Sequence, residues 1–215
     1  MNELTDTYAL GNGSPAGSIL RVEIQKKFYA DEQILGEFEF SLGAGESMAI
    51  VGPSGIGKST LLRLISGLDT DYEGTVSPPD NVSMVFQEPT LFPWISCLQN
   101  LTEACEISEE QALNWLHRVG LSKCADLFPD QMSLGQQRRL ALARAFGISP
   151  KLLLLDEAFV SLDPAIYRDM IQLFQSLRSE TQVATLMITH DIAEAHELAD
   201  NVYRLSGAPA QLLKT

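Results

Sequence analysis

The sequence predicts an α/β fold with a mainly parallel sheet and helices on both of its faces. Short apolar runs typical of buried strands alternate with segments whose apolar residues recur at helical spacing, and this order is typical of parallel sheets. The chain has 215 residues, 45% of them apolar and 20% charged, which is enough for one well-buried domain. We therefore expect one domain over residues 19–215, with a helical subdomain inserted at about 93–131.

The elements are expected in a regular order. Residues 1–18 combine Gly and Pro with polar residues, which predicts a disordered leader. Strands are expected at 19–24, 34–42, 47–51, 82–86, 151–156, 183–189 and 202–205. Helices are expected at 59–66, 133–146, 163–178 and 192–198. Between 93 and 131 the periodicity is also helical, with Gly120 and Pro129 as stops, and this predicts the inserted subdomain.

Net charge and cysteine usage narrow the class of protein. A net charge of −13 argues against binding DNA or RNA, because neutralising phosphates requires clustered Lys and Arg. The three cysteines form no Cys-x-x-Cys pair, which fits a reducing compartment. No apolar run reaches the roughly 18 residues of a membrane span, and the start of the chain lacks the features of a signal peptide. We therefore expect a cytoplasmic protein that contacts a membrane only through a partner.

A glycine-rich loop connects the expected strand 47–51 to the expected helix 59–66. The loop matches Gly-x-x-x-x-Gly-Lys-[Ser/Thr] and consists of Gly52, Pro53, Ser54, Gly55, Ile56, Gly57, Lys58 and Ser59, followed by Thr60. In such a loop the backbone N–H groups and the helix N-terminus face phosphate oxygens. Lys58 is expected to reach the β- and γ-phosphates, and Ser59 to ligate Mg²⁺. The sequence therefore predicts a nucleoside triphosphate site.

An acidic pair ends the apolar strand expected at 151–156. Asp156 can hold Mg²⁺ through water, and Glu157 can orient or deprotonate the water that attacks the γ-phosphate. The alternative is that the pair is a solvated helix cap, but the phosphate loop upstream favours catalysis.

Further motifs follow in a fixed order. They are Gln87 at the end of a strand, Ser133-Leu134-Gly135-Gln136 at the start of a helix, Asp156-Glu157, Ser161-Leu162-Asp163 and His190-Asp191. Together with the phosphate loop, they make the chain resemble the nucleotide-binding subunit of ATP-binding cassette (ABC) transporters from residue 19 to about 205. The resemblance implies an ATP hydrolase with a P-loop NTPase core, an antiparallel β subdomain at the N-terminal side and an inserted α-helical subdomain.

The resemblance also implies roles for single residues. His190 corresponds to the histidine that contacts the γ-phosphate, and Gln87 to the glutamine that touches Mg²⁺ and relays the state of the nucleotide. Phe28, or its neighbour Tyr29, stands where the family places an aromatic that stacks on adenine, and the alternative is a core aromatic. Asp163 is also implied at the nucleotide site.

The motif around Ser133 implies that two chains share each site. In the family this signature sequence touches the ATP that the other subunit holds, which assigns Ser133, Gly135 and Gln136 to the nucleotide of a partner chain. Leu134 replaces the first glycine of the usual Ser-Gly-Gly-Gln, and this departure bears on how tightly two chains close. We expect the second ABC ATPase chain to be a copy of this one.

The remaining expected partners are those of a transporter. Leu91-Phe92-Pro93-Trp94 and the residues from 188 to 195 look most like nitrate, sulfonate and taurine importers, with thiamine-type importers close behind. The resemblance implies integral membrane permease subunits, a substrate-binding protein and a position on the inner face of the cell membrane. Phe92 and Trp94 would then be exposed toward the permease, and burial of both is the alternative.

One other function remains open from the sequence. A soluble ABC ATPase that acts on a protein partner without transport would carry the same motifs. A nucleotide-binding module without turnover is disfavoured by the presence of Glu157 and His190.

Overall fold

The computed structural model describes residues 17–160 and 162–215. Most of the expected leader, residues 1–16, and Ser161 lie outside this part. The strands are β1 (Ser18–Tyr29), β2 (Glu32–Leu35), β3 (Phe38–Gly43), β4 (Ser47–Val51), β5 (Glu73–Ser77), β6 (Val82–Val85), β7 (Leu152–Asp156), β8 (Ala184–Thr189), β9 (Asn201–Gly207) and β10 (Ala210–Lys214). The helices are α1 (Lys58–Ile65), α2 (Cys97–Cys105), α3 (Glu109–Arg118), α4 (Leu134–Gly147), α5 (Pro164–Thr181) and α6 (Ile192–Leu198), with a 3-10 turn η1 (Pro129–Gln131).

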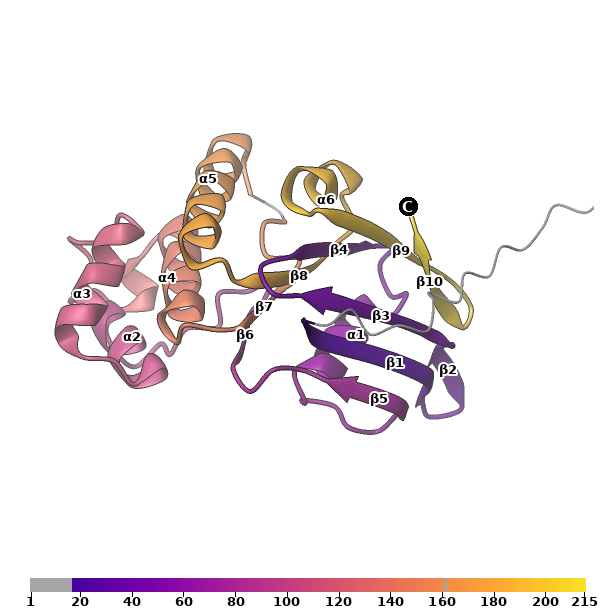
Figure 1. The fold of residues 1–215 in the computed structure, drawn as a ribbon. Helices are drawn as coiled ribbons and strands as arrows, with labels where there is room; N and C mark the ends of the chain where they lie inside the picture. Colours follow the sequence, from indigo (N-terminus) through magenta and orange to yellow (C-terminus); the bar gives the residue numbers. More distant parts are fainter. Residues whose placement is uncertain (1–16, 161) are drawn as a thin grey trace, which may run out of the picture.

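The strands join in one sheet that has a parallel part and an antiparallel part. The parallel part runs β9-β4-β8-β7-β6. β1 pairs antiparallel with β2, β3 and β5 (Figure 1). β10 closes the gap between the two parts, because it pairs antiparallel with β9 and parallel with β2. The predicted α/β class, with a parallel core and an antiparallel part from the N-terminal segment, is confirmed.

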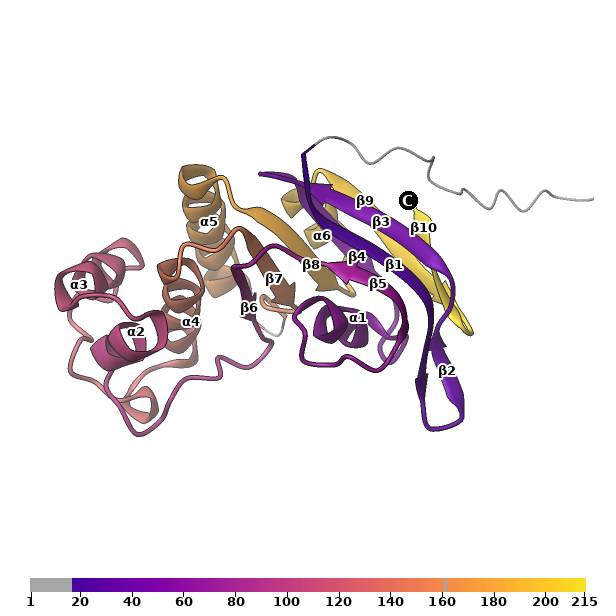
Figure 2. The ribbon, with the colours of Figure 1, turned by 60° about the horizontal axis from the view of Figure 1, so that its bottom comes forward.

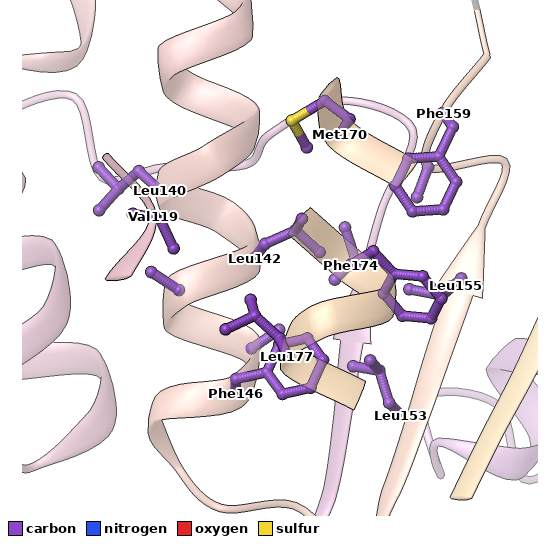
Figure 3. Close-up of a cluster of buried hydrophobic side chains, with 14 of the residues drawn as sticks. Val119, Leu140, Leu142, Phe146, Leu153, Leu155, Phe159, Met170, Phe174 and Leu177 are labelled. Atoms are coloured by element: carbon purple, nitrogen blue, oxygen red, sulfur yellow. The ribbon is translucent and has the colours of Figure 1, made fainter. Parts of the chain in front are cut away.

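Each central strand divides its side chains between two cores. Ala49 and Val51 of β4 belong to a cluster with α4, α5 and α6, whereas Met48 and Ile50 belong to a cluster with α1 and the antiparallel strands. This follows from the period of two along a strand. α1 and the helices α5 and α6 accordingly lie on opposite faces of the sheet (Figure 2). Figure 3 shows the first cluster, in which Phe146, Phe174 and Leu155 meet between α4, α5 and β7.

The register of the parallel strands brings the motif residues to one edge of the sheet. Val51 pairs with Thr189, Asp156 with Ile188, and Leu155 with Val85. The phosphate loop, His190, Glu157 and Gln87 each follow one of these strand ends. Because ligands of open α/β sheets bind beyond the carboxyl ends of the strands, this edge is the place for a site.

Two strand predictions differ from the structure. The single strand expected at 34–42 is broken into β2 and β3 at Gly36, whose N–H donates to the Ala210 carbonyl at 2.8 Å and whose Cβ position would lie 3.3 Å from Pro209 Cγ. The strand expected to end at residue 24 continues to Tyr29, because it pairs with β2 as well as with β3.

Two strands have no counterpart in the prediction. β5 is mostly exposed and polar, so it lacks the apolar alternation that marks a half-buried strand. β10 follows a turn at 208–209 and pairs with the preceding strand β9. Within 93–131 the structure has α2, α3 and η1. None of the described helices has the length and apolar character needed to cross a membrane.

Candidate functional site

The phosphate loop lies between β4 and α1 and requires glycine at two of its positions. Gly57 precedes α1 with φ 109°, and a Cβ there would lie 2.8 Å from Leu35 Cδ2. A Cβ on Gly52 would lie 2.7 Å from the Leu205 carbonyl oxygen. Because α1 has no acidic residue in its first turn, its N-terminal N–H groups and its dipole favour an anion. The loop therefore has the form that a polyphosphate needs.

Lys58 is buried and folds back over this loop. Its ammonium donates to the carbonyl oxygens of Gly52 at 2.9 Å and Pro53 at 3.1 Å, and it lies 3.4 Å from Glu157 Oε1. The positive charge is thus held over the loop, as binding to phosphate oxygens requires.

Ser59 and Asp156 form a pair of oxygen donors beside Lys58. The Ser59 hydroxyl donates to Asp156 Oδ1 at 3.1 Å. Burial raises the pKa of Asp156, the hydrogen bond from Ser59 lowers it in part, and the charge of Glu157 raises it further. A hydroxyl and a carboxylate that meet in this way fit a hard cation such as Mg²⁺, which prefers oxygen ligands.

Glu157 stands between Lys58 and His190. Its φ of 48° is in the left-handed region, and its N–H donates to the Ile188 carbonyl at 3.0 Å, which ties it to the neighbouring strand β8. Oε1 faces Lys58, and Oε2 lies 3.3 Å from Nδ1 of His190. A non-glycine residue in this region carries strain that is common at functional sites. The carboxylate is therefore held beside Lys58 of the phosphate loop, at the carboxyl ends of the central strands.

Other predicted residues lie around this centre. Thr60 is buried within the first turn of α1, and Gln87 is exposed two residues after β6. Phe28 is 40% exposed on β1. Tyr29 is also exposed, but its hydroxyl donates to Asp69 at 3.0 Å and the Lys27 ammonium lies 4.6 Å from the centroid of its ring, so Tyr29 is engaged on both counts and Phe28 is the better candidate of the two for stacking on a base.

The signature residues form a second group, at the start of α4. Ser133 and Gln136 form a capping box: the Ser133 hydroxyl accepts from the Gln136 N–H at 3.3 Å, and Gln136 Oε1 accepts from the Ser133 N–H at 2.8 Å. Gly135 is half-buried, and Leu134 is 48% exposed. Both views show α4 on the far side of β6 and β7 from α1 (Figures 1 and 2). The signature thus belongs to a different part of the surface from the phosphate loop.

Asp163 caps a neighbouring helix. Its Oδ1 accepts from the N–H groups of Ala165 and Ile166, each at 3.1 Å, so the side chain is engaged at the start of α5. Ser161, of the same motif, lies outside the described residues.

Two side chains without a predicted role hold the surroundings of the site. Arg138 is buried in α4 and donates to the Val160 carbonyl at 2.9 Å, so it joins the signature helix to the segment after Glu157. Asn100 is fully buried, and its side-chain amide bonds to both backbone groups of Phe92. Its Oδ1 accepts from the Phe92 N–H at 2.9 Å, and its Nδ2 donates to the Phe92 carbonyl at 3.1 Å. A polar residue on a helix is usually exposed, so neither sequence position suggests such a role.

The segment that Asn100 holds presents aromatic rings to solvent. Trp94 is 72% exposed and Phe92 36%, with ring centroids 5.6 Å apart. The prediction of exposure, rather than burial, agrees with the structure.

The comparisons with known proteins point in one direction. A family model described as ABC transporter matches residues 35–160. The aliphatic sulfonates import ATP-binding protein SsuB 1 of Pseudomonas aeruginosa (strain UCBPP-PA14) is 38% identical over 205 residues, which cover 87% of this chain and 82% of that protein. The corresponding SsuB 2 of Burkholderia lata is 37% identical over 211 residues, covering 93% and 77%. A dimeric ATP-binding cassette in a post-hydrolysis state, bound to ADP and Pi, has a TM-score of 0.77 and 27% identity, covering 91% of this chain and 98% of that one.

Proposed function

Because the chain belongs to the ABC transporter family, as its ATP-binding and hydrolysing subunit, we propose roles for its residues and a transport process that it drives. The observation that carries the proposal is the contact chain from Lys58 through Glu157 to His190, beside the pair Ser59 and Asp156. It supports ATP hydrolysis at the carboxyl edge of the sheet.

In the proposed reaction Glu157 is the general base. It accepts a proton from a water molecule whose oxygen attacks the γ-phosphorus, and the bond between that phosphorus and the β–γ bridging oxygen breaks to give ADP and phosphate. Lys58 binds the β- and γ-phosphate oxygens, and His190, held against Glu157, contacts the γ-phosphate. Phe28 stacks on the adenine base.

Mg²⁺ is the proposed metal. Ser59 and Asp156, with Gln87, would hold it, and the ion would neutralise charge on the β- and γ-phosphate oxygens. The contact between the Ser59 hydroxyl and the Asp156 carboxylate supports this ligand set.

We further propose that each site is completed by a second copy of the chain. The position of α4 away from α1, and the dimeric state of the similar cassette, support an arrangement in which Ser133, Gly135 and Gln136 contact the nucleotide of the partner. Asp163 would lie near the contact between the two copies in this arrangement.

The proposed process is import by separate permease subunits at the inner face of the cell membrane. The names of the similar proteins support a sulfonate-type substrate. We also propose that a substrate-binding protein delivers it. The exposed rings of Phe92 and Trp94, at the N-terminal boundary of the region 93–131 expected as the helical subdomain, support a permease contact there.

Purification of the tagged chain from detergent-solubilised membranes, together with any membrane-spanning permease subunit bound to it, tests the proposal. The chain should copurify with such a subunit, and Trp94→Ala should reduce the copurified amount while leaving the ATPase rate of the isolated chain unchanged. Leu113→Ala, at another exposed apolar residue on α3, is the control and should copurify normally. A chain that hydrolyses ATP but never copurifies with a membrane protein would contradict the transport role.

A further inference from the structure

A buried lysine on β1 forms a charged network that the proposed reaction does not use. Lys27 is 1% exposed, and its ammonium donates to Asp69 Oδ1 at 3.0 Å and to the Asp71 carbonyl oxygen at 2.6 Å. The hydroxyl of Tyr29 donates to the other Asp69 oxygen at 3.0 Å. Burial by itself lowers the pKa of Lys27, but the hydrogen bond with Asp69 and the charges of Asp69 and Asp71 raise it above its ordinary value. The lysine is therefore charged at neutral pH.

The network determines which way Phe28 faces. Successive side chains of a strand point to opposite faces, and Lys27 and Tyr29 both reach Asp69, so Phe28 lies on the other face. The register of β1 and β2 also shifts here, because Lys27 pairs with Leu35 and Phe28 with Gln33. The network and this irregularity together determine the direction in which the exposed Phe28 ring points.

The hairpin formed by β1 and β2 also touches the phosphate loop. A Cβ on Gly57 would lie 3.0 Å from Ile34 Cγ2 and 2.8 Å from Leu35 Cδ2, so β2 packs directly on the loop. Asp69 follows shortly after the C-terminal end of α1, the helix that the phosphate loop opens. Lys27 thus ties the strand of Phe28 to the helix that holds the phosphates.

We propose that Lys27, together with Asp69 and Tyr29, is a positioning group that holds Phe28 at the distance from the phosphate loop at which adenine stacks. This rests on the proposed role of Phe28. Lys27 does not touch the nucleotide and acts only through the hairpin. Its loss leaves Asp69 without its main partner and releases the tip of the hairpin, so base binding weakens while the reaction at Glu157 is untouched.

Steady-state kinetics of the purified chain test the proposal with Lys27→Met. The KM for ATP should rise about five- to tenfold, at the lower end of what loss of base–aromatic stacking produces, with kcat nearly unchanged. Lys26→Met is the matched control, because the neighbouring Lys26 pairs with Glu73 at 3.0 Å through exposed side chains and should leave KM unchanged. Inorganic tripolyphosphate has phosphates but no base, so its inhibition constant should be the same for the Lys27→Met variant and for the wild type.

Two more variants separate the possible results. Tyr29→Phe removes one hydrogen bond and should raise KM roughly twofold, so it decides the question if Lys27→Met does not fold. Phe28→Ala should raise KM at least as much as Lys27→Met, and the double variant should add no further increase, because both changes act on the same contact.

Results that contradict the role of Phe28 differ from those that contradict the role of Lys27. If Phe28→Ala leaves the KM for ATP unchanged, the adenine role in the proposed function is wrong. If Phe28→Ala raises KM but Lys27→Met and Tyr29→Phe do not, the positioning role is overturned while the proposed function stands. If Lys27→Met weakens the binding of ATP and of tripolyphosphate equally, the positioning role is also overturned, because Lys27 would then support the fold as a whole.

Discussion

The carboxylate of Glu157 makes two contacts that bear on different properties of the site. Lys58 at 3.4 Å holds one oxygen toward the phosphate loop, and His190 at 3.3 Å holds the other toward the end of β8. The strained backbone at Glu157 adds to this constraint, since φ 48° is kept by the hydrogen bond to Ile188. Position and basicity of this one group can therefore be tested separately.

Glu157→Gln separates binding from turnover. The amide keeps nearly the same size and place but does not accept a proton from water, so ATP binding should remain while turnover falls by roughly 10²- to 10⁴-fold. Phosphate release and a calorimetric titration with ATP measure the two effects. Glu110→Gln, at an exposed carboxylate on α3, is the control. Near-normal phosphate release by Glu157→Gln would show that the base lies elsewhere.

Lys58→Ala, unlike Glu157→Gln, should weaken the binding of ATP. Removing the buried ammonium takes away charged hydrogen bonds to the phosphates, so ATP should bind roughly 10- to 100-fold more weakly. Calorimetry measures this affinity, with Lys123→Ala as the control at an exposed lysine. Unchanged nucleotide binding would contradict the role of Lys58.

Glu194, buried in α6, gives a pH-dependent prediction. Burial raises its pKa above the ordinary value of 4.5, a hydrogen bond with Thr189 lowers it in part, and the charges of Asp191 and Glu157 raise it again. Below pH 4.5 the carboxyl is protonated in both folded and unfolded chains. As the pH rises through its raised folded pKa, the folded chain loses stability relative to the unfolded chain. Glu194→Gln removes this loss.

The melting temperature of Glu194→Gln, minus that of the wild type, should therefore increase as the pH rises from about 4.5 upward. Thermal unfolding across a series of buffers measures it, and Glu110→Gln should show no such trend. A difference that stays constant with pH would mean that the pKa of Glu194 is not raised in the folded chain, because its protonation would then be the same in the folded and unfolded states.

Among the elements, the loop before α2 depends on one buried side chain. Asn100 accepts from the Phe92 N–H and donates to the carbonyls of Phe92, Ile95 and Ser96. Asn100→Ala removes these partners from the Phe92 N–H and from the Phe92 and Ile95 carbonyls, while the Ser96 carbonyl keeps its bond from the backbone N–H of residue 100, and the change should cost about 1–3 kcal/mol of unfolding free energy. Urea denaturation measures this cost, and Asn114→Ala, at an exposed position on α3, should cost little. Equal stability of the two variants would contradict the assigned role.

The elements that the sequence predicts best are those whose signal is local. β4, β7 and β8 are apolar on both faces, because each strand lies between two cores, and their limits were predicted closely. β2 and β3 were predicted as one strand, since the break at Gly36 depends on a hydrogen bond to Ala210, far along the chain. β5 carries no apolar alternation, because only its pairing with β1 makes it a strand.

The same distinction holds for the site. The phosphate loop is a contiguous pattern and was predicted residue by residue. The choice between Phe28 and Tyr29 depends on Asp69, about 40 residues away, and the sequence left it open. Lys27 and Arg138 look like surface residues in the sequence, because a buried charge is explained only by distant partners.

At the scale of the whole molecule, the two sets of residues proposed to contact nucleotide lie apart from each other. The phosphate loop, Glu157 and His190 gather at the edge of the sheet, while the signature begins α4 beyond β6 and β7 (Figure 2). A second copy in the opposite orientation would bring each signature to the other phosphate loop. ATP bound between the two copies would then favour the closed pair by its differential affinity alone.

The Glu157→Gln variant should therefore elute as a dimer in size-exclusion chromatography with Mg-ATP and as a monomer with ADP. Leu134 bears directly on this result, because it is 48% exposed at the first position of α4 and replaces a glycine of the usual signature. If the variant stays monomeric with saturating ATP, either the leucine blocks the seam or the natural partner is a different chain. Adding Leu134→Gly distinguishes these explanations at a helix cost of only about 1 kcal/mol. Recovery of the dimer would implicate the leucine, whereas continued failure would contradict self-assembly and leave closure to another cassette or to the membrane subunits.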